Sequence, residues 1–251
     1  MSQPARHMSL GAFLMATGHH VAAWRHPEVP ANAGLDIQHY RYLAQLAEAA
    51  CFDAVFVADS VAAATGEIAS HMARSDHFEP LTLLAALSAV TERIGLIATA
   101  TTTYNEPYHV ARKFASLDHL SGGRSGWNLV TSDNAAEALN FGRDEHIGHA
   151  ERYSRAREFH QVVTGLWDSW EDDAFIRDKA SGAYYDPAKL HVLDHVGEHF
   201  RVKGPLNVAR SPQGQPVIVQ AGSSETGREL AAQSAEVVFT AHLATVLRHA
   251  G

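Results

Sequence analysis

The chain has 251 residues, of which 46% are hydrophobic and 19% charged, a balance typical of a folded domain with a buried core. Its formal net charge of −8, with histidine counted as neutral, gives no electrostatic support to nucleic acid or an anionic membrane as a partner. No apolar run reaches the ~18 residues that a membrane-spanning helix needs. The single cysteine, Cys51, excludes an internal disulfide and favours a reducing, cytoplasmic location.

Short apolar runs alternate with longer helical patterns, which predicts βα units and a mainly parallel sheet. The predicted strands span residues 9–16, 52–58, 94–100, 126–131, 216–221 and 236–240. The first run would also pass for the core of a short signal peptide, but the charge before it is thin, and we interpret it as a strand. Each run is almost continuously apolar, as expected for strands covered on both faces.

Helix start and stop signals separate these strands. The predicted helices span residues 37–50, 81–90, 108–120, 151–170 and 227–233. Asp36 is placed to cap the first of them, and Pro80 and Pro107 stand at the starts of the next two. Gly122 is suited to a left-handed helix stop, and Ser224 is suited to cap the last helix.

Two stretches interrupt the alternation, 61–78 and 171–215. The second is too long for an ordinary connection, and in a barrel such an insertion is expected to lie over the active-site mouth as a lid. No linker between domains is apparent, so we expect one domain over 1–251. The strand count leaves two architectures open, a six-stranded doubly wound sheet and an eight-stranded barrel of which six strands are present.

The strongest local signal for a ligand is the turn after the fifth predicted strand, residues 220–228. Gly222, Ser223 and Ser224 lead from the strand into a helix, so that free backbone N–H groups, the helix dipole and two hydroxyls converge. This pattern indicates a phosphate site, to which Arg228 could add a charged contact. An ordinary serine-capped helix explains the same residues equally well.

Other polar residues follow the predicted strands, where ligands of parallel α/β folds bind. The hydroxyls from Thr101 to Tyr104 suit the polar edge of a planar ligand, or simply overrun their strand. Asp59 would accept a hydrogen bond from a ligand or cap a turn. His149 and Tyr153 are four residues apart and would share a helix face.

Several enzyme classes lack support in the sequence. The 17 histidines suggest metal binding, but none lies in an H-E-x-x-H motif, and no cysteine or carboxylate completes a familiar ligand set. A G-x-S-x-G elbow, a Walker P-loop and a G-x-G-x-x-G turn after a strand are all missing from the 251 residues. The usual serine hydrolases, P-loop nucleotide hydrolases and Rossmann dehydrogenases are therefore disfavoured.

One long segment, 104–132, reads YNEPYHVARKFASLDHLSGGRSGWNLVTS and closely resembles the nitrilotriacetate monooxygenase family of the luciferase-like superfamily. The shorter segments 18–25, 52–59 and 149–153 and the turn at 220–228 resemble it too. The resemblance runs from about residue 9 to residue 240, almost the whole chain.

This resemblance implies a TIM (β/α)₈-type barrel and reduced FMN as the cofactor, delivered by a separate NAD(P)H-dependent flavin reductase. It also implies O₂ as a reactant and a small organic molecule that receives one oxygen atom, in an enzyme we expect to be a homo-oligomer. Relatives in this family continue with two more strands, so we expect a barrel truncated after about six strands.

The resemblance also suggests roles for individual residues. Asp59 and Thr102 would contact the isoalloxazine side, and Asn128 would lie beside the ring. The expected contacts to the ribityl chain and phosphate are His149, Tyr153, Ser223 and Ser224. The candidate catalytic residues, for steering oxygen or protons near the ring, are His19, His20 and Tyr104.

Two alternatives to a flavin monooxygenase remain open at this point. The same superfamily contains deazaflavin-dependent hydride-transfer enzymes, which the Ser223–Ser224 turn does not exclude, although the 104–132 segment argues against them. A truncated chain could also be a flavin-binding remnant without catalytic activity. The identity of the substrate does not follow from the sequence.

Overall fold

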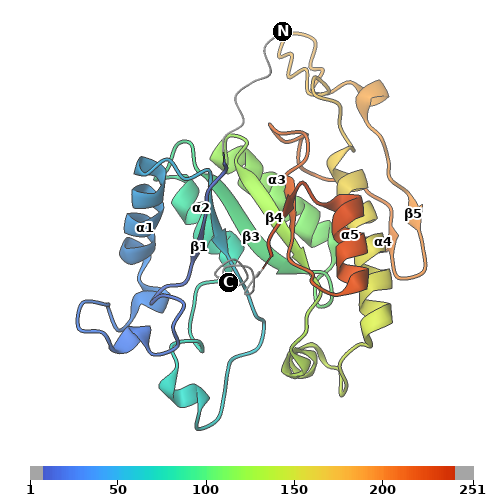
Figure 1. Cartoon of the computed structure of the whole chain (residues 1–251). Helices are drawn as coiled ribbons and strands as arrows, with labels where there is room; N and C mark the ends of the chain where they lie inside the picture. The colour runs from blue at the N-terminus through green and yellow to red at the C-terminus, as the bar shows by residue number, and fades with distance from the viewer. Residues whose placement is uncertain (1–7, 241–251) are drawn as a thin grey trace, which may run out of the picture.

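The fold is built on one parallel β-sheet whose strands lie side by side in chain order (Figure 1). The computed structural model describes residues 8–240. The six strands of this sheet are β1 (Gly11–Leu14), β2 (Ala54–Val57), β3 (Gly95–Thr101), β4 (Ser125–Val130), β7 (Val217–Gln220) and β8 (Val237–Val238). Each predicted strand is therefore confirmed; four are shorter than predicted, and β3 and β4 keep their predicted lengths but are shifted by one residue. The two ends of the predicted domain, 1–7 and 241–251, lie outside the described residues.

The order of the strands decides between the two architectures that the sequence left open. The sheet runs β1-β2-β3-β4-β7-β8 without the reversal that defines a doubly wound fold, so that alternative is wrong. The sheet also curls. The Phe239 ring, just after β8, lies with its centroid 5.9 Å from that of Phe13 in β1 and 6.1 Å from that of Phe56 in β2. These six strands therefore form part of a barrel.

The helices begin and end where the sequence signals indicate. Their bounds are α1 (Ile37–Ala49), α2 (Pro80–Ser88), α3 (Pro107–Ser121), α4 (His149–Trp167) and α5 (Glu225–Ser234). The Asp36 carboxylate accepts hydrogen bonds from the backbone N–H groups of Gln38 and His39, which caps α1. Gly122 ends α3 with a φ of 68°, the left-handed conformation that glycine adopts without strain.

The core lies between the sheet and these helices. Trp127 of β4 is fully buried, and its ring packs against Phe114 of α3, Phe159 and Trp167 of α4. Its indole N–H donates to the carbonyl of Ala100 at 2.9 Å, which satisfies the one polar atom of this side chain. None of the helices within residues 8–240 is long and apolar enough to cross a membrane.

The insertion 171–215 contains a small antiparallel pair, β5 (His195–Val196) and β6 (Arg201–Val202), which follows α4 in Figure 1. It is fastened at the end of α4, because Ser169 Oγ accepts from the Leu206 N–H at 3.0 Å and the Trp170 indole donates to the Leu206 carbonyl at 2.8 Å. None of its residues lines the pocket described below. The expectation of a lid was wrong, because these contacts hold the insertion against α4 instead.

Candidate functional site

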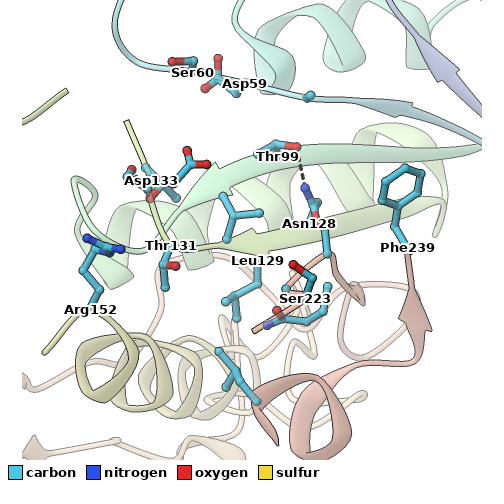
Figure 2. Close-up of a pocket in the computed structure, with 18 of the residues that line it drawn as sticks. Asp59, Ser60, Thr99, Asn128, Leu129, Thr131, Asp133, Arg152, Ser223 and Phe239 are labelled. Carbon is cyan, nitrogen blue, oxygen red and sulfur yellow. Dashed lines mark hydrogen bonds between the residues drawn. The ribbon is translucent and has the colours of Figure 1, made fainter. Parts of the chain in front are cut away.

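The site is a pocket of about 480 Å³ at the carboxyl ends of the strands, a volume within the usual range of small-molecule sites (Figure 2). Its walls come from the ends of β2, β3, β4 and β7, from the loop after β2 and from the first turn of α4. Of the seven predicted cofactor residues, all but Thr102 line it: Asp59, Asn128, His149, Tyr153, Ser223 and Ser224.

Asn128 on β4 and Gln220 on β7 each bury a polar atom without a partner. Both side chains are 3% exposed. The Asn128 amide N–H donates to Thr99 Oγ1 at 2.8 Å, while its Oδ1 is unpaired, and so is Gln220 Nε2. Leaving such groups unbonded costs about 1–3 kcal/mol each, so a ligand that supplies a donor and an acceptor here would gain that energy. The sequence pointed to Asn128 as a site residue, and to Gln220, the last residue of β7, only as the start of the 220–228 turn.

The turn after β7 forms another wall. Ser224 Oγ accepts from the Gly227 N–H at 3.1 Å as the cap of α5, and donates to the Tyr153 hydroxyl at 3.3 Å. A Cβ on Gly222 would lie 2.9 Å from the Gly227 Cα, so the turn fits against the helix only with glycine there. Ser223 is exposed and lines the pocket. The predicted cap is therefore confirmed, whereas the phosphate site at this turn stays a prediction.

Two basic side chains from the first turn of α4, His149 and Arg152, line the pocket. His149 is the first residue of the helix, and its ring centroid lies 4.7 Å from that of Tyr153. Arg152 donates through Nη1 to the Ile147 carbonyl at 2.7 Å, and its buried Nε has no partner. Sequence reasoning missed Arg152, although its place three residues after His149, on the same helix face, was a usable signal.

Three aromatic rings close the apolar part of the pocket. Phe13, Phe56 and Phe239 all line it, and Phe13 meets Phe56 edge-on with ring centroids 4.7 Å apart. Figure 2 shows Phe239 near Asn128 and far from Arg152, so the pocket runs from an aromatic end to a polar end. These residues were not predicted. They come from three separate strand segments, which only the curl of the sheet brings together.

The acidic side of the pocket lies on the loop after β2. The Asp59 Oδ1 atom is 3.5 Å from His77 Nε2, and the hydrogen bond between them raises the pKa of His77 above its ordinary value of 6.5. Glu137 is 4% exposed and fixes the same loop, because its Oε1 accepts from Ser60 Oγ at 2.9 Å and from the Val61 N–H at 3.3 Å. These bonds hold Asp59 and Ser60 at the pocket edge.

Thr102 and Tyr104 lie outside the pocket lining. Thr102 is fully buried, and both its N–H and its hydroxyl donate to the carbonyl of Val130, at 2.9 and 3.2 Å. The Tyr104 hydroxyl is 2.7 Å from His146 Nδ1, and its ring stacks on Phe141 with a centroid distance of 4.9 Å. Burial raises the pKa of Tyr104. These two side chains are therefore bonded to other parts of the protein.

The two histidines after β1 are exposed and do not line the pocket. His19 is close to it, since its ring lies 4.6 Å from that of Phe13, edge-on, and its Nε2 is 3.1 Å from the Phe13 carbonyl oxygen. His20 Nδ1 accepts from the Ala22 N–H at 3.2 Å, which is a local turn contact. Within residues 8–240 no three His, Cys, Asp or Glu side chains are grouped to hold a metal ion.

Comparison with known proteins adds a family to this geometry. Residues 12–249 match a family model described as luciferase-like monooxygenase. The chain is 55% identical to N-acetyl-S-(2-succino)cysteine monooxygenase of Bacillus subtilis, over 96% of this chain and 54% of that protein. It is 54% identical to nitrilotriacetate monooxygenase component A of Aminobacter aminovorans, over 94% of this chain and 54% of that protein. The chain thus spans about half the length of these curated relatives.

A solved structure has the same fold over this part of the chain. The crystal structure of a riboflavin lyase, described as containing a modified FMN and riboflavin, superimposes with a TM-score of 0.89 at 38% sequence identity. The likeness covers 95% of this chain and 55% of that chain.

Proposed function

The chain belongs to the luciferase-like monooxygenase family, and from this membership we propose that it binds FMN and acts in an FMN-dependent monooxygenase. In this proposal a separate NAD(P)H-dependent reductase supplies reduced FMN, and O₂ and a small organic molecule are the other reactants. We place the reaction in the cytoplasm and expect a homo-oligomer. When bound, reduced FMN supplies two electrons, so that one atom of O₂ enters the substrate and the other leaves as water.

The observation that carries the proposal is the pair of unpartnered amide atoms in the pocket, Asn128 Oδ1 and Gln220 Nε2. A flavin ring has both an N–H donor and carbonyl and ring-nitrogen acceptors along its polar edge. The two amides supply one acceptor and one donor, so the residues present fit that edge. Such a ligand would remove two unfavourable buried groups at once.

The other pocket residues suit the remaining parts of FMN. Ser223, Ser224 and the first N–H groups of α5 would bind the phosphate, with His149 and Tyr153 from α4 beside it. Arg152 would add a positive charge to the side of the pocket away from Phe239 (Figure 2).

The protein's contribution to the chemistry is mainly to orient the reactants and to exclude water. Phe13, Phe56 and Phe239 form an apolar wall on the side of the pocket where Phe239 lies near Asn128 and far from Arg152 (Figure 2). Such a wall keeps water from the reacting atoms and thereby favours oxygen transfer over wasteful decay. His19, behind Phe13, would hold that ring in place; we propose this role for it rather than direct contact with the cofactor.

The phosphate assignment is tested by comparing FMN with riboflavin, which lacks the phosphate. Binding is measured by quenching of flavin fluorescence. Ser223→Ala should weaken FMN binding about tenfold, equivalent to ~1.4 kcal/mol, and leave riboflavin binding unchanged. Ser234→Ala, at the other end of α5, is the matched control and should change neither. Equal binding of the two flavins by the unaltered chain would exclude a phosphate site at this turn.

Turnover is a separate question from flavin binding. The chain is mixed with a flavin reductase, NADH and FMN, and O₂ uptake is followed with and without candidate substrates. Substrate-dependent uptake with an oxygenated product supports the monooxygenase. FMN binding without any oxygenated product across a broad substrate set would instead favour a flavin-binding protein without catalysis.

A further inference from the structure

A second cavity, of about 320 Å³, lies beside the flavin pocket and has no role in the function proposed above. Ala58, Asp59 and Ser60 line both spaces, so this segment is the wall between them. In Figure 2, Asp59 and Ser60 lie across the flavin pocket from Asn128 and Ser223. We call this second cavity the side chamber. Its remaining walls are the loop after β1, the loop after β2 and the inner face of α1.

The roof of the side chamber is built from those two loops, which are bonded to each other. Arg74 Nη2 donates to the carbonyls of Gly18 and His19, at 3.2 and 2.9 Å. The Trp24 indole donates to the His71 carbonyl at 3.0 Å. Because these bonds join residues far apart in the sequence, the chamber is a preformed space and not a chance gap between loose loops.

The lining of the side chamber is mainly small and apolar. It includes Ala31, Ala62, Ala64 and Ala73 from the two loops and Phe78 next to α2. Alanine side chains leave room where larger residues would fill the space, and they offer no hydrogen bonds. Such a lining suits an apolar group and provides no strong fixed contacts for a polar one.

The charges on the chamber wall oppose an anionic guest. Asp59 and Asp76 both line the space. The Arg74 guanidinium also lines it, but it already donates to the carbonyls of Ala73, Gly18 and His19. The other basic side chain of the lining, His77, is paired with Asp59, with Nε2 3.5 Å from Oδ1. A carboxylate that entered would therefore approach Asp76, and it would have to compete with Asp59 for His77 and with backbone carbonyls for Arg74.

From the lining, the charges and the shared wall, we propose that the side chamber binds the non-reacting part of the substrate, and that this part is an uncharged, largely aliphatic group. The inference rests on the proposed monooxygenase function only in that it calls the ligand a substrate, because binding of an aliphatic group in the chamber needs no flavin. It separates this chain from relatives named for polycarboxylates such as nitrilotriacetate, despite their high sequence identity.

The test measures binding of two probes of equal chain length, hexan-1-ol and hexanoate, to the flavin-free chain at neutral pH. Ligand-observed NMR gives the dissociation constants. Hexan-1-ol should bind at least about tenfold more tightly than hexanoate. Equal or tighter binding of hexanoate would overturn the proposal.

Variants locate the bound probe. Ala62→Phe fills the side chamber and should weaken hexan-1-ol binding about tenfold or more. Ala63→Phe is the matched control, because Ala63 is exposed and lines neither space. Ala73→Leu, from another part of the loop, repeats the test should Ala62→Phe fail to fold. Unchanged hexan-1-ol binding in a folded chamber variant would place the probe elsewhere and overturn the proposal.

A parallel FMN titration on the same preparations separates the two proposals. Chamber binding without FMN binding would leave this inference standing and remove the proposed function. FMN binding with no preference for hexan-1-ol would leave the proposed function standing and overturn this inference.

Discussion

The two ends of the parallel strands bury polar groups in opposite ways. At the amino end of β4, the Asp118 carboxylate accepts from Ser125 N–H and Oγ, at 3.1 and 2.9 Å, and from both the backbone N–H and the side-chain amide of Gln213. At the carboxyl ends, Asn128 Oδ1 and Gln220 Nε2 have no partner. Bonded networks stabilise the folded chain by themselves, whereas unpaired groups are stabilised only by a ligand.

The largest loss of stability is expected when Arg124, at the amino end of β4, is replaced. Its guanidinium donates to the carbonyls of Ser88, Thr91, Ile94 and Ser121, at 2.7 to 3.1 Å. Arg124→Met should lower the free energy of unfolding by about 3 kcal/mol, because several carbonyls lose their donor. Urea denaturation measures this.

The matched control for Arg124 is Arg93, which is exposed and lies between Thr91 and Ile94, two of the residues that Arg124 contacts. Arg93→Met should change stability by no more than ~0.5 kcal/mol. FMN affinity of the folded Arg124 variant should equal that of the unaltered chain. A loss below ~1 kcal/mol at Arg124 would contradict the view that the amino end carries the stability.

Replacing Gly222, at the carboxyl ends of the strands, should affect both stability and FMN binding. An added Cβ would lie 2.9 Å from the Cα of Gly227, so the turn and α5 must separate. Gly222→Ala should therefore cost about 2 kcal/mol of stability and also weaken FMN binding. A Cβ on Gly148, the cap of α4, would meet nothing within 4 Å, which makes Gly148→Ala the control, with an expected change of a few tenths of a kcal/mol. Unweakened FMN binding in Gly222→Ala would separate this turn from the cofactor.

Glu158 of α4 is hydrogen-bonded within the protein, as Asp118 is, although it lies on the helix that borders the pocket. Its carboxylate is 2.9 Å from His195 Nε2 and accepts from the N–H groups of His199 and Phe200, both at 2.9 Å. Burial alone would raise the pKa of Glu158, but these bonds outweigh it and hold that pKa below its ordinary value of 4.5. The carboxylate therefore contributes stability that is fully present above pH 4.5 and is lost as the pH falls through the lowered pKa.

Glu158→Gln should lower stability at neutral pH by about 1–2 kcal/mol. The difference from the unaltered chain should shrink in denaturation series that extend below pH 4.5. Glu198→Gln, in the β5–β6 hairpin that Glu158 contacts, is the control, since this side chain is 78% exposed. A difference that stays constant down to the most acidic point would show that the ionised carboxylate is not the stabilising form.

How much the sequence predicted depends on whether the signal was local. Caps and breakers such as Asp36, Pro107 and Gly122 act within a few residues, so the helices and strands were predicted closely. Ser223 and Ser224 were found for the same reason, because a strand, a small-residue turn and a helix start adjoin in the chain.

The parts of the site that were missed depend on contacts between distant segments. Phe13, Phe56 and Phe239 meet only because the sheet curls, and no spacing in the sequence encodes that meeting. Tyr104 follows a strand like a site residue, but its bond to His146, from a loop far along the chain, holds it outside the pocket lining. The path of the 171–215 insertion was likewise set by distant partners such as Ser169.

The smallest change in the free energy of unfolding is expected at Gln220, and it is the one replacement expected to stabilise the flavin-free chain. Methionine has almost the same shape as glutamine but no amide, so Gln220→Met removes an unpaired buried group without opening a cavity. The flavin-free chain should keep its stability or gain up to about 1 kcal/mol, while FMN affinity falls about tenfold. Gln45→Met is the control, because this exposed amide donates to the Val90 carbonyl at 2.9 Å away from the pocket. If Gln220→Met instead lost stability as Arg124→Met is expected to, the amide would already be bonded in the flavin-free chain, and the distinction between the two strand ends would fail.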